Sequence, residues 1–370
     1  MTETTPAKSA TKPVDSKGPV LSLAEQRRQR RKESRLRRRA HLEATLKSYF
    51  GSRFPLNKLT PSQYADIDFG ERVRVLTAVF EFDRPKLETE ASKLVISDNS
   101  QHTSLIGEAW KQALDRFVVP DCERIIRRHF ASEVEQQGVT SIKRRVRNIC
   151  MQRPIYQPVL SVVGNRDGFS LAVIDAEGTT LHSEDLLRND YGPDKIKQRI
   201  GELVEQHSVA VVAIAEGPRT RLIEQLASDS LGNELKAKGV GWFIVASDGL
   251  ENFCKTAVGC EEIPNVPPEQ RVAIALGRRA QNPLFEFVKC APRDWLTEQQ
   301  QTIVDIKRLS EEIRLVYQSC LARVGVDVNR ASAAVLSLIP GLEESVSRRI
   351  EAQVRGGSRI TCLSQLRDLL

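Results

Sequence analysis

The sequence holds little of what cross-linked or metal-binding proteins need. Its seven cysteines form no Cys-x-x-Cys pair and are odd in number, which is typical of reduced thiols in a cytoplasmic protein. The five histidines are dispersed among 370 residues, so we expect no metal site and no cofactor. Aromatic residues make up only 5% of the chain, which argues against a surface that stacks on nucleic-acid bases.

Long apolar runs are missing as well. No stretch is apolar enough to span a bilayer, so we expect no membrane partner. The first residues are polar and contain no hydrophobic segment, which argues against a signal peptide. The sequence therefore indicates a cytoplasmic protein, and its 370 residues suffice for two or three domains with buried cores.

Positive charge is concentrated in one segment. Residues 27–39, RRQRRKESRLRRR, contain nine Arg or Lys and one Glu, a net charge of +8. Because the whole chain carries +7, the remainder sums to −1. One interpretation is a solvated charged helix, but phosphate groups are the obvious counter-charge, and the missing apolar face excludes a membrane-surface helix. We expect non-specific binding of RNA or DNA through Arg27, Arg28, Arg30, Arg31, Lys32, Arg35, Arg37, Arg38 and Arg39.

Composition and periodicity divide the chain into five parts. They are a disordered tail at 1–20, a basic helix at 21–48, a helical region at 49–152, an α/β domain at 153–292 and a helical region at 293–370. The basic helix is expected to begin at Ser22, which can form a capping box with Glu25. In the third part, Arg72–Phe82 alternates like a strand, and Pro120 is expected to break the helical stretch Ser104–Cys150.

The fourth part alternates strands and helices. Runs of β-branched and apolar residues predict strands at Val159–Val163, Phe169–Ile174, Thr179–His182, Val209–Ala215 and Gly241–Ala246. Helical periodicity predicts helices at Asp194–His207 and Arg219–Ser230. Three hairpin-type strands followed by two helix–strand pairs is the element order of an RNase H-like domain. The expected fold class is therefore α/β plus all-α, with an RNase H-like domain flanked by helical regions.

The carboxylates needed for two-metal hydrolysis are incomplete in this domain. Two-metal nucleases converge carboxylates on ions about 3.5–4 Å apart. In RNase H-like enzymes the first strand ends in an Asp that holds Mg²⁺, and we expect Arg166 at that position here. Asn282 stands where nucleases often add another acid. We therefore expect a degenerate domain without catalytic residues, the alternative being a metal-dependent nuclease that uses Asp167, Glu216 and Asp248.

The last part contains a candidate helix–hairpin–helix. The sequence IPGL at Ile339–Leu342 has the form in which Gly341 turns the chain in a conformation closed to residues with a Cβ. Backbone N–H groups at the next helix start can then face a phosphate, with Arg348 and Arg349 nearby. Glu343 stands two residues after the glycine and is followed by Glu344, and both carboxylates oppose phosphate binding, so a purely structural turn is the alternative.

Six stretches resemble the bacterial Tex transcription accessory proteins, whose eukaryotic relative is an elongation factor that travels with RNA polymerase II. They are YF…PLNKLTPS (49–62), AWKQALDRFVVPDCERIIRR (109–128), VLSVVGNRDGFSLAVID (159–175), RRAQNPLFEFVK (278–289), GVDVNRASAAVL (325–336) and SLIPGL (337–342). The third is similar to the start of YqgF, the RNase H-like domain of Tex. The resemblance implies a Tex-core-like region at 49–152, a YqgF domain at 153–292 and a helix–hairpin–helix after it.

The resemblance also predicts what differs from the family. The chain stops at Leu370, before the expected second hairpin and the S1 RNA-binding domain, and a basic segment replaces the usual N-terminal helices. We expect a non-catalytic nucleic-acid-binding accessory factor in transcription or RNA metabolism, with the transcription or translation machinery as a further candidate partner. The alternatives are a metal-dependent nuclease or resolvase, and a protein-interaction scaffold that does not bind nucleic acid.

Overall fold

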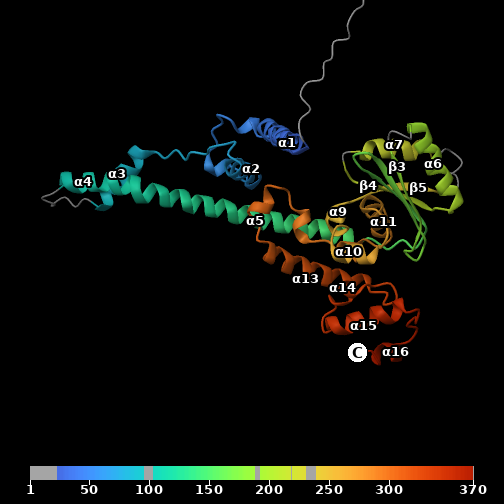
Figure 1. Ribbon diagram of the computed structural model, residues 1–370. Coiled ribbons are helices and arrows are strands. Elements are labelled where there is room, and N and C mark those ends of the chain that lie inside the picture. Colours follow the sequence, from blue (N-terminus) through green and yellow to red (C-terminus); the bar gives the residue numbers. More distant parts are fainter. Residues whose placement is uncertain (1–22, 96–102, 188–191, 218, 231–238, 370) are drawn as a thin grey trace, which may run out of the picture. The chain divides into compact units, whose positions relative to one another are not determined.

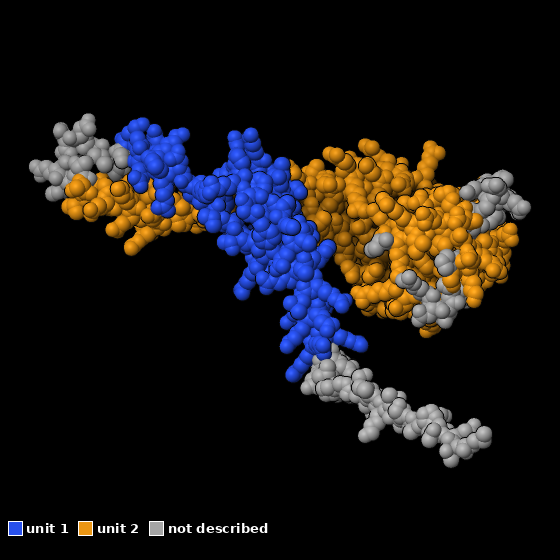
Figure 2. Space-filling view, turned by 90° about the horizontal axis from the view of Figure 1, so that it is seen from above, with its two compact units in different colours: residues 1–101 blue, residues 102–370 orange. Residues whose placement is uncertain are grey.

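The computed structural model describes residues 23–95, 103–187, 192–217, 219–230 and 239–369 (Figure 1). The chain forms two compact units, residues 1–101 and 102–370 (Figure 2). The tail expected at 1–20 and the helix start at Ser22 lie outside the described residues. The finer division into five parts stays a prediction.

The first unit consists of short helices around a small core. Its elements are α1 (Leu23–Thr45), η1 (Lys47–Tyr49), η2 (Leu56–Lys58), α2 (Pro61–Arg72) and α3 (Arg84–Val95). Helix α2 starts at a capping box in which the side chains of Thr60 and Gln63 satisfy each other's backbone N–H groups. Leu46 follows α1 and is buried, and its side chain approaches Gly70 of α2. Leu46 therefore holds the C-terminal end of the basic helix against α2, and it lies after the charged segment.

The strand expected at Arg72–Phe82 is wrong, because α2 runs to Arg72 and residues 73–83 contain neither helix nor strand. The N–H groups of Val75 and Leu76 both donate to the carbonyl of Gly70, at 2.9 and 3.1 Å, which turns the chain back on the helix end. Within the described residues, every strand belongs to one sheet formed by residues 159–245. An alternating segment without a neighbouring strand has no backbone partner and does not form a strand.

The second unit begins with a long helical rod. It comprises α4 (Thr103–Ala113), a π-helical turn η3 (Leu114–Val118) and α5 (Val119–Cys150). The expected break at Pro120 is wrong, because this residue lies in the first turn of α5, where a missing N–H costs little. Proline has no N–H group to donate to the preceding turn, and the wider π-helical turn directly before it accommodates this missing hydrogen bond. Helix α5 has 32 residues and is about 48 Å long.

A mixed five-stranded sheet follows, in the order β3-β2-β1-β4-β5. Its strands are β1 (Val159–Gly164), β2 (Gly168–Ile174), β3 (Thr180–Leu187), β4 (Val211–Ala215) and β5 (Gly241–Val245). β1 pairs antiparallel with β2 and parallel with β4, so it is the central strand. The expected strands are confirmed, except that the third continues beyond His182 to Leu187. The order of elements is that expected for an RNase H-like domain.

Helices cover both faces of the sheet. Leu160 and Val162 of β1 pack in one hydrophobic cluster with α6 (Pro193–Gln206) and α7 (Thr220–Ser230), whereas Val159 packs in another. This alternation follows from the two-residue period of a strand. On the second face lies α11 (Pro268–Gln281), where the Oγ of Ser161 donates to the carbonyl of Ala273 at 2.6 Å. The α/β fold class is therefore confirmed.

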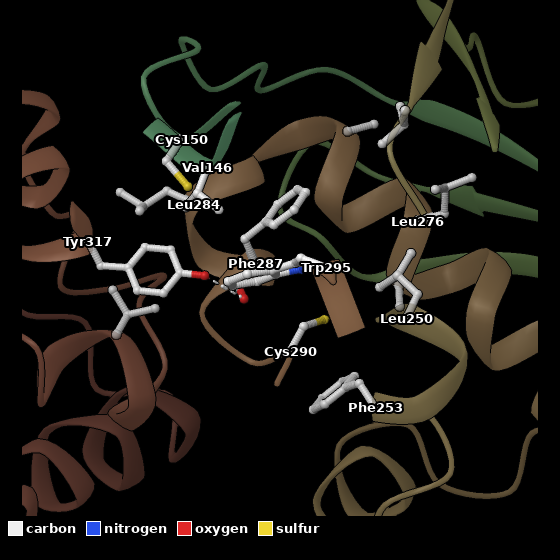
Figure 3. Close-up of a cluster of buried hydrophobic side chains, with 14 of the residues drawn as sticks. Val146, Cys150, Leu250, Phe253, Leu276, Leu284, Phe287, Cys290, Trp295 and Tyr317 are labelled. Carbon is white, nitrogen blue, oxygen red and sulfur yellow. Dashed lines mark hydrogen bonds between the residues drawn. The ribbon is translucent and has the colours of Figure 1, made fainter. Parts of the chain in front are cut away.

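The remaining helices follow the sheet in the chain, and most of them share the second cluster with α5 and the sheet. They are α9 (Leu250–Phe253), α10 (Ala257–Glu262), α12 (Pro283–Phe287), η4 (Pro292–Trp295), η5 (Gln300–Thr302), α13 (Ile306–Val324), α14 (Ala333–Leu336), α15 (Glu344–Arg355) and α16 (Leu363–Arg367). Figure 3 shows Phe287, Trp295 and Tyr317 gathered beside Cys150 of α5. The Tyr317 hydroxyl donates to the carbonyl of Phe287 at 3.0 Å. One continuous core thus joins α5, the sheet and the C-terminal helices.

Candidate functional site

The candidate site lies where β1, β4 and β5 end. A cavity of about 290 Å³ opens there, and its lining includes Val163, Glu216, Arg219, Ser247 and Asn252. Ligands of open α/β sheets bind outside the carboxyl ends of the strands, so this is the expected position for a site. The segments that follow β4 and β5 supply its polar side chains, whereas the β1–β2 hairpin supplies Val163 and Gly164.

The residue of β1 that lines this cavity is Val163. The expectation that Arg166 occupies the position of the metal-binding Asp is therefore wrong. Arg166 is exposed in the turn between β1 and β2, as is Asp167. The Oδ1 of Asn165 accepts hydrogen bonds from the N–H groups of Asp167 and Gly168, at 3.0 and 2.6 Å, and this closes the turn. The turn begins directly after Gly164 and removes both charged residues from the cavity lining. An isopropyl group cannot bind a cation, so the first-strand carboxylate is still absent.

The two other expected acids do come together. Glu216 follows β4 and Asp248 follows β5, and both accept from the same guanidinium group, that of Arg145 on α5. Its Nη2 lies 3.5 Å from Oε2 of Glu216 and 2.7 Å from Oδ2 of Asp248. Sequence reasoning missed Arg145, and the only signal for it was the basic run KRRVR at 143–147.

Arg145 changes what the two carboxylates can do. A metal-dependent mechanism needs free carboxylates that converge on a cation, whereas these oxygens already share a fixed positive charge. Within the described ranges, no three His, Cys, Asp or Glu side chains are grouped so that they could hold a metal ion. The arrangement is suited to holding α5 against the sheet edge. Arg145 is 45% exposed, so its contribution to stability is on the order of 1 kcal/mol.

Asn282, the residue expected to replace a further acid, has a structural role. It is the N-cap of α12, where its Oδ1 accepts a hydrogen bond from the N–H of Phe285 at 3.3 Å. It is not among the residues that line the cavity at the strand ends.

The basic helix α1 presents its charges to solvent. From Arg28 to Arg39 every described side chain is exposed, and even Leu36 is 67% exposed. The side chain of Arg27 lies outside the described part of the chain. Arg39 makes an ion pair with Glu43 one turn later, at 2.9 Å. The helix therefore has no apolar face to bury, as the sequence predicted, and a phosphate contact by its basic side chains stays a prediction.

The predicted hairpin has the expected backbone. Gly341 lies between α14 and α15 with a φ of +88°, which confirms that this position disfavours residues with a Cβ. Arg348 makes an ion pair with Glu344 at 2.5 Å, so part of its charge is compensated. Arg349 is exposed. The predicted phosphate binding at this turn is opposed by Glu344 and stays a prediction.

A family model described as the Tex protein YqgF-like domain matches residues 158–281, the segment that forms the sheet and α11. This chain contains a Tex YqgF-like domain. YdcI of Bacillus subtilis is 28% identical over 327 residues, which are 87% of this chain and 45% of that protein. The transcriptional accessory protein Tex of Neisseria gonorrhoeae is 29% identical over 189 residues, covering 51% of this chain and 25% of that protein.

A more distant relative is likewise matched over only part of its length. The human S1 RNA-binding domain-containing protein 1 is 26% identical over 249 residues, 66% of this chain and 25% of that protein. The chain thus spans less than half the length of these relatives. A solved structure of T. thermophilus RuvC with a Holliday junction substrate aligns with 46% of this chain and 97% of that one, at 12% identity and a TM-score of 0.26. A likeness at that level carries no argument about activity.

A search of the described residues finds no helix with the length and apolar character needed to cross a membrane.

Proposed function

We propose that this chain is a non-catalytic accessory factor that binds nucleic acid and acts in transcription or RNA metabolism. The names of its relatives support this class of function: one is called a transcriptional accessory protein, and another an S1 RNA-binding domain-containing protein. The YqgF-like domain matched at residues 158–281, which is described as a domain of Tex proteins, supports the same class of function. We further propose cytoplasm as its location and the transcription or translation machinery as a candidate partner.

The observation that carries the non-catalytic part is the contact of Arg145 with both Glu216 and Asp248. A cation-binding site would have to expel this guanidinium group before it could use either carboxylate. Val163 supplies no replacement ligand at the end of β1. These residues favour an accessory role over two-metal hydrolysis.

The nucleic-acid-binding part rests on α1. Its exposed basic side chains can reach phosphates without a fixed register, which favours binding of RNA or DNA without sequence preference. A contribution from the turn at Gly341 and from Arg348 and Arg349 is a second element of the proposal.

The test of the catalytic question is a cleavage assay with Mg²⁺ or Mn²⁺ on branched, hybrid and single-stranded substrates. We expect no cleavage by the wild-type protein. The matched variant Glu216→Gln removes one carboxylate and keeps the size of the side chain. Metal-dependent cleavage that disappears in Glu216→Gln would overturn the proposal in favour of a nuclease.

A further inference from the structure

Helix α5 ends in a second basic stretch, on the rod of the second unit. Residues 140–153, TSIKRRVRNICMQR, contain five Arg or Lys and no Asp or Glu. The neighbouring end of α13, residues 313–326, likewise contains no acid. Since the chain outside the α1 segment sums to −1, these acid-free stretches are a local departure from a nearly neutral body.

Two of these basic residues are used inside the fold. Lys143 makes an ion pair with Glu312 of α13, and Arg145 bridges the acids at the sheet edge. The Lys143 contact holds α5 and α13 together, and Figure 1 shows α13 running beside the second half of α5. These ion pairs compensate the charges of Lys143 and Arg145, and they hold α5 between α13 and the strand ends.

Three arginines at the same end of this helix pair remain exposed. Arg144 and Arg147 are three residues apart on α5 and are therefore neighbours on one face, and Arg323 lies in the last turn of α13. None of the three forms an ion pair with a residue that the structure describes. We call Arg144, Arg147 and Arg323 the arginine surface.

The thiol of Cys320 on α13 lies near two of these guanidinium groups. Burial raises the pKa of Cys320, and the positive charges of Arg147 and Arg323 act against this increase. Both side chains therefore lie near the same residue of α13, although they belong to different helices. Exposed arginines without a carboxylate partner are available to an anion from outside the chain.

We propose that the arginine surface binds the phosphate backbone of a nucleic acid, as a second contact in addition to that of α1. Arg145, which lies between Arg144 and Arg147 in sequence, reaches the strand ends, where ligands of open α/β sheets bind. Arg144 and Arg147 lie within one turn of Arg145 along α5, on another side of the helix. Guanidinium groups match phosphate oxygens with two parallel hydrogen bonds, which suits this partner.

Arginines in the last turns of two helices also stabilise the helix dipoles. One charge at each helix end is enough for that role, and it predicts no dependence of nucleic-acid affinity on these side chains. The two roles are therefore separable by a binding measurement on folded protein.

This inference rests on the proposed nucleic-acid binding, and the experiment separates the two. Arg144→Gln/Arg147→Gln/Arg323→Gln is made in the wild-type chain and in a chain whose α1 basic residues are Gln. Binding of short fluorescent single strands is measured over a salt series, with folding checked by melting curves. We expect the triple change to reduce the salt slope by about 2 in both backgrounds, because each phosphate contact contributes about 0.7 on single strands. At about 0.1 M salt this corresponds to a loss of affinity of up to about 100-fold.

Two controls make the result specific. The triple Lys variant keeps the charges and should keep most of the slope. Arg314→Gln removes an exposed arginine from the same helix, nine positions before Arg323 and thus on the opposite side, and should leave the slope unchanged.

An unchanged slope in the Gln triple variant would overturn the arginine surface and leave the proposed function intact, because the wild type still binds. Binding to polyglutamate is measured in parallel. A triple variant that loses only its binding to polyglutamate would also overturn the arginine surface as a nucleic-acid contact, since the surface then fits an acidic protein. A wild-type protein that binds no strand at low salt would overturn the proposed function and this inference with it.

Discussion

Lys289 is the most deeply buried basic group among the described ion pairs of the second unit. Its Nζ lies 2.6 Å from carboxylate oxygens of both Glu262 and Glu286, so one ammonium group joins α10 and α12. Burial alone would raise the pKa of Glu262, but the charge of Lys289 lowers it below its ordinary value. Burial would lower the pKa of Lys289, and the two carboxylates raise it.

These shifts predict the pH dependence of stability. Because the folded pKa of Glu262 is lowered, its stabilising contribution is present above its ordinary value of 4.5 and is lost as the pH falls through the folded pKa. Lys289→Met should cost about 3–5 kcal/mol near neutral pH, since Glu286 loses its described ion pair and Glu262 keeps only the one with Arg278. Urea unfolding between about pH 7 and pH 3 measures both effects.

The variant should also reverse the sign of the pH effect. Without the ammonium group, Glu262 and Glu286 repel each other, and protonation relieves that repulsion. The variant should therefore recover part of its lost stability on acidification, while the wild type loses stability. Lys307→Met, at an exposed lysine, is the control and should change neither value by much. Parallel pH curves for wild type and Lys289→Met would contradict this account.

Gly341 gives a prediction about a single backbone angle. A Cβ built at this residue meets nothing within 4 Å, so only the φ of +88° opposes a side chain there. Gly341→Val should destabilise the turn by about 1–3 kcal/mol, as measured by thermal unfolding. Gly341→Asn should cost less, because Asn tolerates this region better than other residues with a Cβ. Equal losses for Val and Asn would point to a cause other than the backbone angle.

At the scale of elements, α1 and α5 use positive charge differently. The charges of α1 point to solvent, with Arg39–Glu43 as one local pair. On α5, Lys143 and Arg145 hold other elements in place. A charge-dense segment can thus be an exposed binding element or a structural clamp, depending on what packs beside it.

Replacing the nine basic residues of the α1 segment by Gln tests the first role. Gln ranks close to Arg and Lys in helix propensity, so the helix should persist. If roughly half of these side chains contact phosphates of duplex DNA, the substitution should reduce the salt slope by about 4, equally on all sequences. Circular dichroism checks the helix content. A sequence-dependent loss of affinity would contradict non-specific backbone binding.

At the scale of the whole molecule, the continuous core makes the second unit one body. Cys150 of α5, Phe287 of α12 and Tyr317 of α13 pack together, although they are far apart in sequence (Figure 3). A ligand that contacts α5 therefore contacts a rod fixed to the sheet. We expect this body to act as a platform for nucleic acid rather than as a site of chemistry.

A pull-down with and without nuclease treatment tests that role. If nucleic acid tethers the partners, they should be lost after treatment, and the variant with Gln in α1 should recover fewer of them from the start. The Glu216→Gln variant is a matched control outside both basic surfaces and should recover the wild-type set. Partners that survive both the treatment and the charge removal would indicate a protein scaffold instead.

The sequence by itself determined the elements that depend on local sterics and periodicity. Runs of β-branched residues predicted the strands, because alternate side chains must fit two packed faces. Gly341 was predictable, since a left-handed turn between helices excludes most other residues. The incomplete set of carboxylates was also predictable, although Val163 and not Arg166 occupies the end of the first strand.

Only the tertiary structure decided how the acids and bases are combined. Arg145 is 71 residues from Glu216 and 103 residues from Asp248 in the chain, and no local pattern links them. The segment 73–83 has strand-like alternation but no neighbouring strand, and Pro120 begins a helix because a π turn precedes it. In each case the outcome depends on which groups the folded chain brings within a few ångströms, and hydrogen bonds and ion pairs act only over that range.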